Sequence, residues 1–216
     1  MLTSAGIRNE SLRNTLKKLV GDVKIKIAFI PTAANVEEGD KDWLINDLVN
    51  CKKFGEVDIV DISALPKDKW LPRLEWANVI FVGGGNTTYL MECVRKFGLA
   101  DEIENLLKTR VYVGISAGSL ILSDSIQASS EYLFKVYGDE VRDPPRGLGL
   151  VNFHVRPHFG SAHFPKLTKE NLEKVFEDSD LDAYVLDDES GVVWIDGKVE
   201  VVSEGKWIKF DGKTGN

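Results

Sequence analysis

The sequence has no long hydrophobic run and little cysteine. None of its apolar stretches approaches the roughly 20 residues that a membrane-spanning helix needs. Residues 1–21, MLTSAGIRNESLRNTLKKLVG, contain no apolar core of the kind found in signal peptides, so we expect no secretory signal and a cytoplasmic location. The two cysteines, Cys51 and Cys93, form no CxxC pair and are expected to be buried thiols, without a disulfide framework or a zinc ribbon.

Clusters of basic residues are also missing. The chain carries 27 Lys and Arg against 34 Asp and Glu, a net charge of −7, and the pair Lys17-Lys18 belongs to the solvated face of one helix pattern. Because nucleic acid binding needs grouped positive charge, we expect neither nucleic acid nor a membrane as a partner. With 43% apolar and 28% charged residues, the composition is typical of a globular protein, and the length of 216 residues predicts one domain over residues 1–216.

Apolar runs alternate with amphipathic helix patterns through the first half of the chain. The runs that predict strands cover residues 23–34, 57–63, 76–85 and 111–116, and the helix patterns cover residues 40–53 and about 87–108. Alternation of this kind predicts parallel βαβ units, and strands that are apolar throughout predict a sheet covered on both faces. We therefore expect an α/β fold with a mostly parallel, doubly wound sheet flanked by helices.

The end of the chain has a different pattern. A helix is predicted over residues 167–179 and a strand over 183–188, followed by alternating runs that are separated by Asp196-Gly197 and Glu204-Gly205. Asp-Gly between alternating runs is a strong hairpin signal. The sequence therefore predicts an antiparallel β-meander appended to the parallel sheet.

The pentapeptide Gly114-Ile115-Ser116-Ala117-Gly118 interrupts the transition from an apolar strand to an apolar helix pattern. Its spacing, G-x-S-x-G, is that of a nucleophile elbow, in which a sharp turn exposes the serine at the top of a sheet. The alternative is an ordinary tight turn, in which glycine serves the backbone and the serine caps the helix. The pentapeptide alone favours neither interpretation.

A second unusual strand end is Gly83-Gly84-Gly85-Asn86-Thr87. Three glycines before a helix expose backbone N–H groups that suit an anion or a developing oxyanion. The structural alternative is a tight loop with Asn86 or Thr87 as helix N-cap. The loop lacks both the G-x-G-x-x-G spacing and the Walker lysine, which disfavours dinucleotides and nucleoside triphosphates.

The three histidines all lie in one short segment, FHVRPHFGSAHF, as His154, His158 and His163. A serine nucleophile needs a base, and His158, which follows Pro157 where a strand leaves the sheet, is the best candidate. His154 lies in an apolar strand and is expected to be a satisfied core residue, and His163 an exposed loop residue. The spacing of the three on a non-helical segment disfavours zinc, and we predict no metal site.

The spacing of residues in the sequence does not identify which acidic residue would orient the base. The candidate carboxylates are Asp124, Glu131, Asp139, Glu140, Asp187, Asp188 and Glu189.

Three motifs taken in order, GGGNT at residues 83–87, GISAGS at 114–119 and RPHF at 156–159, resemble the peptidase E family of serine peptidases, together with AFIPTAA at 28–34 and GLGLVNF at 147–153. The resemblance implies a fold related to class I glutamine amidotransferases, with Ser116 as nucleophile and His158 as general base. The N–H groups of Gly85 and Ala117 would form the oxyanion hole. The family's acid, about fifteen residues after the serine, falls on Glu131, with Asp188 and Glu189 as alternatives.

The resemblance also implies a substrate, short peptides with N-terminal aspartate, and no cofactor. A cation is then needed for the substrate carboxylate, and Arg156 is the first candidate, with Arg142 and Arg146 as alternatives. Asn86 is the other residue expected to bind the substrate. The predicted partner is this small peptide, with a homodimer as an open arrangement of the chain. Two other functions are kept as hypotheses: a serine esterase, and a non-catalytic ligand-binding protein on the same scaffold.

Overall fold

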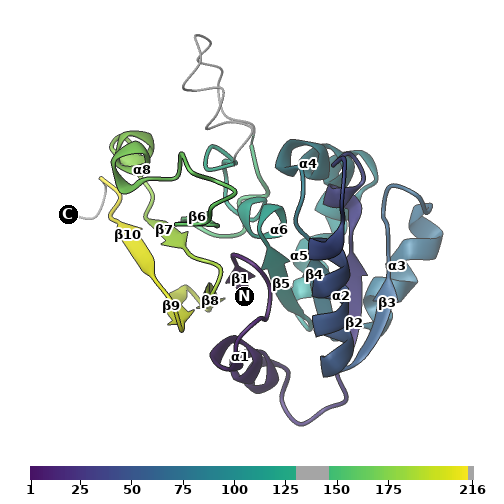
Figure 1. The fold of residues 1–216 in the computed structure, drawn as a ribbon. Coiled ribbons are helices and arrows are strands. Elements are labelled where there is room, and N and C mark those ends of the chain that lie inside the picture. Colours follow the sequence, from purple (N-terminus) through teal and green to yellow (C-terminus); the bar gives the residue numbers. More distant parts are fainter. Residues whose placement is uncertain (130–145, 214–216) are drawn as a thin grey trace.

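The computed structural model describes residues 1–129 and 146–213 (Figure 1). A seven-stranded sheet has the order β3-β2-β4-β5-β1-β8-β9. Its strands are β1 (Leu2–Thr3), β2 (Lys26–Ile30), β3 (Glu56–Ile59), β4 (Val79–Val82), β5 (Val111–Ile115), β8 (Ser190–Ile195) and β9 (Lys198–Ser203). The first five of these strands are parallel to one another, whereas β8 pairs antiparallel with both β1 and β9. The predicted, mostly parallel α/β sheet is therefore confirmed.

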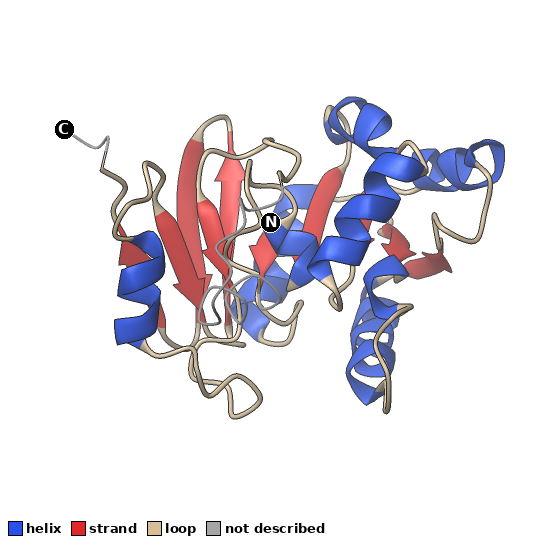
Figure 2. Cartoon of the chain, turned by 90° about the horizontal axis from the view of Figure 1, so that it is seen from above, coloured by secondary structure: helices blue, strands red, loops and turns tan. Residues whose placement is uncertain are grey.

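Helices cover both faces of the parallel strands (Figure 2). Alternate residues of β2 and β4 point to opposite cores: Ile27, Phe29, Val79 and Phe81 to one, and Ala28, Ile30, Ile80 and Val82 to the other. The first core is closed by α1 (Glu10–Val20) and α2 (Asp42–Phe54), and the second by α3 (Lys67–Trp76), α4 (Thr87–Lys96) and α5 (Leu99–Leu107). This two-sided burial explains why the strands are apolar throughout.

A second, three-stranded sheet carries the rest of the chain. Its order is β10 (Trp207–Phe210), β7 (Ala183–Leu186) and β6 (His154–Arg156), and α8 (Lys169–Phe176) packs on it through Leu172 and Phe176. The predicted hairpin joins β8 to β9, with positive φ at Asp196 (49°) and Gly197 (81°). The predicted meander is divided between the two sheets, because β10 pairs with β7. The Asp187 N–H donates to the Lys206 carbonyl at 3.0 Å and directs the chain to that sheet.

The strand β1 was not anticipated from the sequence, because two residues are too few to show a period. Leu2 pairs with Gly114 and Thr3 with Ile115, so the chain start lies between β5 and β8. This arrangement brings the segment that follows β1 beside Ser116. Cys51 and Cys93 are both buried free thiols, as expected. Among the described residues, no helix combines the length and apolarity that crossing a membrane requires.

Candidate active site

The Gly114 to Gly118 segment forms a sharp turn from β5 into the short helix α6 (Ala117–Leu120). Ser116 has φ 50° and ψ −110°, a conformation that costs a non-glycine residue roughly 1–3 kcal/mol and is concentrated at functional sites. The serine side chain makes no capping hydrogen bond to α6. The strained serine and the absent cap favour the elbow interpretation over an ordinary capped turn.

Both glycines of the turn are needed because backbones approach closely there. A β-carbon on Gly114 would lie 2.6 Å from the Gly118 carbonyl oxygen, and one on Gly118 would lie 2.1 Å from the Val82 carbonyl oxygen. Such contacts are far inside van der Waals distance. The start of α6 can therefore pack against β4 and β5 only when these positions carry no side chain.

Replacing Gly118 by alanine is expected to lower the free energy of unfolding by roughly 3 kcal/mol, measured by urea denaturation. The sign of this change is informative, because replacing glycine by alanine within a helix ordinarily stabilises a protein by about 1 kcal/mol. Gly149→Ala is the control: its φ of 66° strains alanine, but no atom lies within 4 Å of the added carbon. Equal stability of Gly118→Ala and the unaltered protein would contradict the close packing described here.

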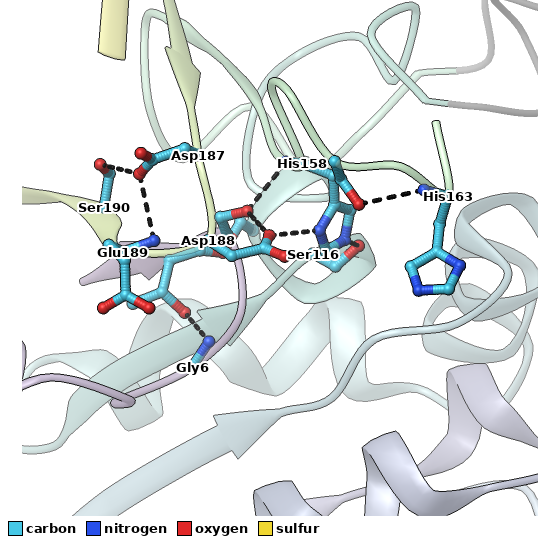
Figure 3. A network of polar contacts seen from close by, with 12 residues as sticks. Gly6, Ser116, His158, His163, Asp187, Asp188, Glu189 and Ser190 are labelled. Carbon is cyan, nitrogen blue, oxygen red and sulfur yellow. Dashed lines mark hydrogen bonds and ion pairs between the residues drawn. The ribbon is translucent and has the colours of Figure 1, made fainter. Parts of the chain in front are cut away.

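Ser116, His158 and Asp188 form a continuous chain of contacts (Figure 3). The Ser116 Oγ lies 2.9 Å from His158 Nε2, and His158 Nδ1 lies 2.7 Å from Asp188 Oδ1. Each side chain comes from a different element: the start of α6, the loop after β6 and the loop after β7. The arrangement has the connectivity of a nucleophile, a base and an orienting acid.

His158 is held by contacts on its backbone and on its ring. Its φ is 66°, and its N–H donates to Ser4 Oγ at 2.8 Å, while Ser4 Oγ donates to Asp188 Oδ1 at 2.8 Å. The imidazole stacks on Phe164, with ring centres 4.9 Å apart and planes inclined by 10°. These contacts leave Nε2 directed at Ser116.

Asp188 is suited to remain ionised. Burial raises the pKa of its carboxyl group, but the hydrogen bonds from His158 and Ser4, together with the charge of Arg8, hold the pKa below its ordinary value. An ionised carboxylate on Nδ1 places the imidazole proton on that nitrogen and leaves Nε2 free to accept the proton of Ser116. This arrangement is the one that a serine nucleophile at neutral pH would require.

Of the carboxylates considered from the sequence, only Asp188 contacts His158 within the described part of the chain. Asp187 accepts from Ser190 Oγ at 2.6 Å, and Glu189 accepts from Asn9 Nδ2 at 3.0 Å. Asp124 borders a different cavity. Glu131, the acid expected from the family resemblance, lies outside the described residues, as do Asp139 and Glu140. Asp188, one of the alternatives, is thus the carboxylate that contacts His158, and its role as the orienting acid stays a prediction.

The glycine-rich loop after β4 lies directly against the serine. A β-carbon on Gly84 would stand 3.3 Å from Ser116 Cβ, and one on Gly85, whose φ is 128°, would stand 2.3 Å from the Ala33 carbonyl oxygen. Asn86 is the N-cap of α4, since its Oδ1 accepts from the Tyr89 N–H at 2.8 Å. Ala117 opens α6, where a backbone N–H has no intrahelical acceptor. Oxyanion binding by the Gly85 and Ala117 amides stays a prediction.

These groups border one cavity of about 590 Å³. Its lining includes Ser116, His158, Asp188, Gly84, Gly85, Asn86 and Arg156, together with Arg8, Glu37, Trp43 and Asp47. Sequence reasoning missed Arg8 and Asp47. The sequence held one sign that Asp47 is buried. It lies four residues after Trp43 and four before Cys51, so it shares a helix face with these two apolar residues.

Arg156 lines this cavity while being only 1% exposed. Its Nη1 donates to the Ala128 carbonyl at 2.6 Å, and its guanidinium lies 5.7 Å from the centre of the Phe164 ring. Arg142, one of the alternative cations, lies outside the described residues, and Arg146 is not part of the cavity lining. Binding of substrate by Arg156 and Asn86 stays a prediction.

The other two histidines have separate surroundings. His154 is buried, with Nδ1 3.0 Å from Ser123 Oγ and Nε2 3.2 Å from Gln127 Nε2, and burial lowers its pKa. It is the satisfied core residue that was expected. His163 is an exposed loop residue at the cavity. Over residues 1–129 and 146–213, no three His, Cys, Asp or Glu side chains gather as a metal-binding group would require.

Comparison with known proteins gives consistent results. The model of peptidase family S51 matches residues 1–202. A peptidase E of Nostoc sp. is 29% identical over 173 residues, covering 77% of this chain and 65% of the relative. A probable alpha-aspartyl dipeptidase of Drosophila melanogaster is 36% identical over 110 residues, covering 47% of this chain and 43% of the relative. The chain thus spans less than two thirds of the length of either relative.

A solved structure has the same fold. The crystal structure of a peptidase from an acI-B1 Actinobacterium superposes with a TM-score of 0.68 at 20% identity, covering 98% of this chain and 93% of that one. At this identity the likeness establishes the arrangement of helices and strands.

Proposed function

This chain belongs to peptidase family S51, and we propose that it is a serine-type dipeptidase that removes N-terminal aspartate from short peptides. The proposal rests on the contacts that join Ser116 to His158 and His158 to Asp188. All three residues line a cavity of about 590 Å³. The similarity to a probable alpha-aspartyl dipeptidase supports the choice of substrate.

In the first half of the proposed reaction, Ser116 Oγ attacks the carbonyl carbon of the scissile bond while His158 Nε2 takes its proton. The negative charge that develops on the carbonyl oxygen is stabilised by the Gly85 and Ala117 amides. His158, now an imidazolium held by Asp188, gives the proton to the leaving amine. The bond to that amine breaks, and an acyl-enzyme on Ser116 remains.

In the second half, a water molecule gives its proton to His158 and attacks the ester of the acyl-enzyme. Collapse of the second tetrahedral intermediate returns the proton to Ser116 and releases the free amino acid. Proton transfer and oxyanion stabilisation are both supplied by residues of this chain. The reaction as proposed therefore uses no cofactor.

Selection of aspartate requires a positive group for its side chain. In our proposal Arg156 provides this charge and Asn86, at the start of α4, adds a polar contact, since both residues line the cavity. An almost fully buried guanidinium loses little freedom when it binds a carboxylate, which favours a specific contact. A substrate with a neutral first residue would not form this charge-assisted contact.

The proposal is tested with a panel of substrates: Asp-Leu, Asp-Ala, Glu-Leu, Ala-Leu, an isoaspartyl peptide and a short-chain p-nitrophenyl ester. We expect Asp-Leu to be cleaved with a kcat/KM at least roughly 100-fold above that of Ala-Leu, because Ala-Leu lacks the carboxylate that forms the charge-assisted contact. A fluorophosphonate should block turnover, and peptide mapping should find the adduct on Ser116.

Other outcomes select other functions. Cleavage of the ester alone would indicate a serine esterase. Cleavage of Asp-Leu and Ala-Leu at equal rates would retain the peptidase and reject aspartate specificity. Absence of both turnover and adduct would reject the proposal in favour of a ligand-binding protein.

A further inference from the structure

Asp47 is a buried acidic residue in the candidate active-site cavity to which the reaction described above assigns no task. It lies on α2, is 5% exposed and lines the cavity together with Ser116. Its Oδ1 would lie 3.5 Å from a β-carbon on Gly6, so the carboxylate faces the loop between β1 and α1. Figure 3 shows Gly6 of that loop close to the contacts that join Asp188, His158 and Ser116.

The carboxylate of Asp47 has no direct partner within the described residues: it accepts no hydrogen bond there and forms no ion pair. Burial raises its pKa to about 7, with the charge of Arg8 acting to lower the value and that of Asp188 to raise it. A largely buried carboxylate without a protein partner is costly and calls for an explanation, and a bound ligand is one that fits a residue at the wall of a cavity. Because Asp47 lines the cavity, such a ligand would reach it from the cavity that also contains Ser116.

We propose that Asp47 binds the free α-ammonium group of the peptide substrate, an inference that rests on the proposed peptidase function. In a substrate whose first residue is attacked by Ser116, the amino nitrogen lies only about 2.5 Å from the reacting carbon. That nitrogen must therefore enter the same cavity. An ammonium group carries three N–H donors, and the oxygens of Asp47 accept no hydrogen bond from the described residues. A hydrogen bond between two charged groups is also stronger than one between neutral groups.

The placement of charges supports this assignment. Oδ1 of Asp188 already contacts both His158 and Ser4, whereas the carboxylate of Asp47 has no such contact within the described residues. Arg156 comes from β6 and Asp47 from α2, so two different elements offer opposite charges to the two charged groups of an N-terminal aspartate. Asp47 would then restrict the enzyme to substrates with a free amino terminus, because an acylated nitrogen brings no positive charge.

The experiment compares Asp-Leu with succinyl-Leu, which is the same molecule without the amino group. Binding is measured by calorimetry on the Ser116→Ala protein, where no turnover interferes. We expect Asp-Leu to bind at least roughly 10-fold more tightly than succinyl-Leu, and we expect Asp47→Asn, added to Ser116→Ala, to abolish this difference. Glu37→Gln is the matched control, because it removes one negative charge from the same cavity. Glu37 differs from Asp47 in being exposed.

The kinetic counterpart uses the otherwise unaltered enzyme. Asp47→Asn should raise KM for Asp-Leu by roughly 10- to 100-fold with kcat changed little, and should leave kcat/KM for succinyl-Leu unchanged. Equal affinity of the two ligands for the Ser116→Ala protein, no binding of either, or a preference that survives Asp47→Asn would overturn the inference. Turnover without amine preference would reject the Asp47 site alone, whereas amine preference without turnover would reject the peptidase proposal alone.

Discussion

Replacing Ser116 by alanine is expected to lower kcat/KM for Asp-Leu by roughly 10⁴- to 10⁶-fold, the loss typical when a nucleophile of such a triad is removed. Alanine removes the Oγ that lies 2.9 Å from His158 Nε2 and leaves no atom to form the acyl-enzyme. The measurement is the initial rate of leucine release over a range of substrate concentrations. Folding should be retained, since the Ser116 side chain caps no helix.

Ser119→Ala is the matched control for this loss. Ser119 is buried in the same short helix, and its Oγ donates to the Thr3 carbonyl at 2.8 Å, so its replacement tests the packing of the turn without touching the reacting atoms. We expect Ser119→Ala to lose about 1 kcal/mol of stability and to retain most of its activity. A Ser116→Ala protein that still released leucine at a substantial rate would refute the acyl-enzyme mechanism.

His158→Ala supplies a second check on the same unit. If Ser116 and His158 act together, either replacement alone should cost about as much as both combined, because removal of one member disables the other. Additive losses would indicate two independent contributions. The double variant thus distinguishes a working triad from a serine and a histidine that merely lie close together.

The parallel sheet, its helices and the two central catalytic candidates could be predicted because their signals are local. The apolar strands, the spacing of Gly114 and Gly118 around Ser116, and the proline before His158 each occupy a few consecutive residues. The structure adds the reason for the glycines, which is the close approach of Gly114 to the Gly118 carbonyl and of Gly118 to the Val82 carbonyl. These glycines are therefore needed to avoid steric clashes. The G-x-S-x-G pattern alone does not show whether a glycine is needed for close packing or for an unusual backbone conformation.

The acid could not be selected from the sequence because its contact depends on strand pairing in the second sheet. The strands β6 and β7 are parallel, with Arg156 opposite Val185, so His158 and Asp188 both leave the sheet just beyond this pair. Ser4, which bonds both residues, follows a strand of only two residues. Asp47 was missed for a similar reason: a single carboxylate in a helix pattern indicates a solvated face until its neighbours are known.

Asp188→Asn is expected to lower kcat by roughly 10⁴-fold, while Glu131→Gln should change it by less than roughly 10-fold. An asparagine at position 188 keeps the size of the side chain, but its amide can donate to Nδ1 and so favours the imidazole tautomer that places the proton on Nε2. His158 could then no longer accept the proton of Ser116. The pair of variants also decides between the acid that contacts His158 in the structure and the acid implied by the family resemblance.

The two variants must be compared at more than one pH. The hydrogen bonds from His158 and Ser4 hold the pKa of Asp188 below its ordinary value, so this group stays ionised from neutral pH down to about pH 4, the usual carboxyl range. The acid limb of the activity profile should then not report Asp188, and the activity lost in Asp188→Asn should not return at any pH between 5 and 9. A loss of similar size in Glu131→Gln, with Asp188→Asn nearly unaffected, would assign the orienting role to Glu131, because only the group that holds Nδ1 of His158 can set its tautomer.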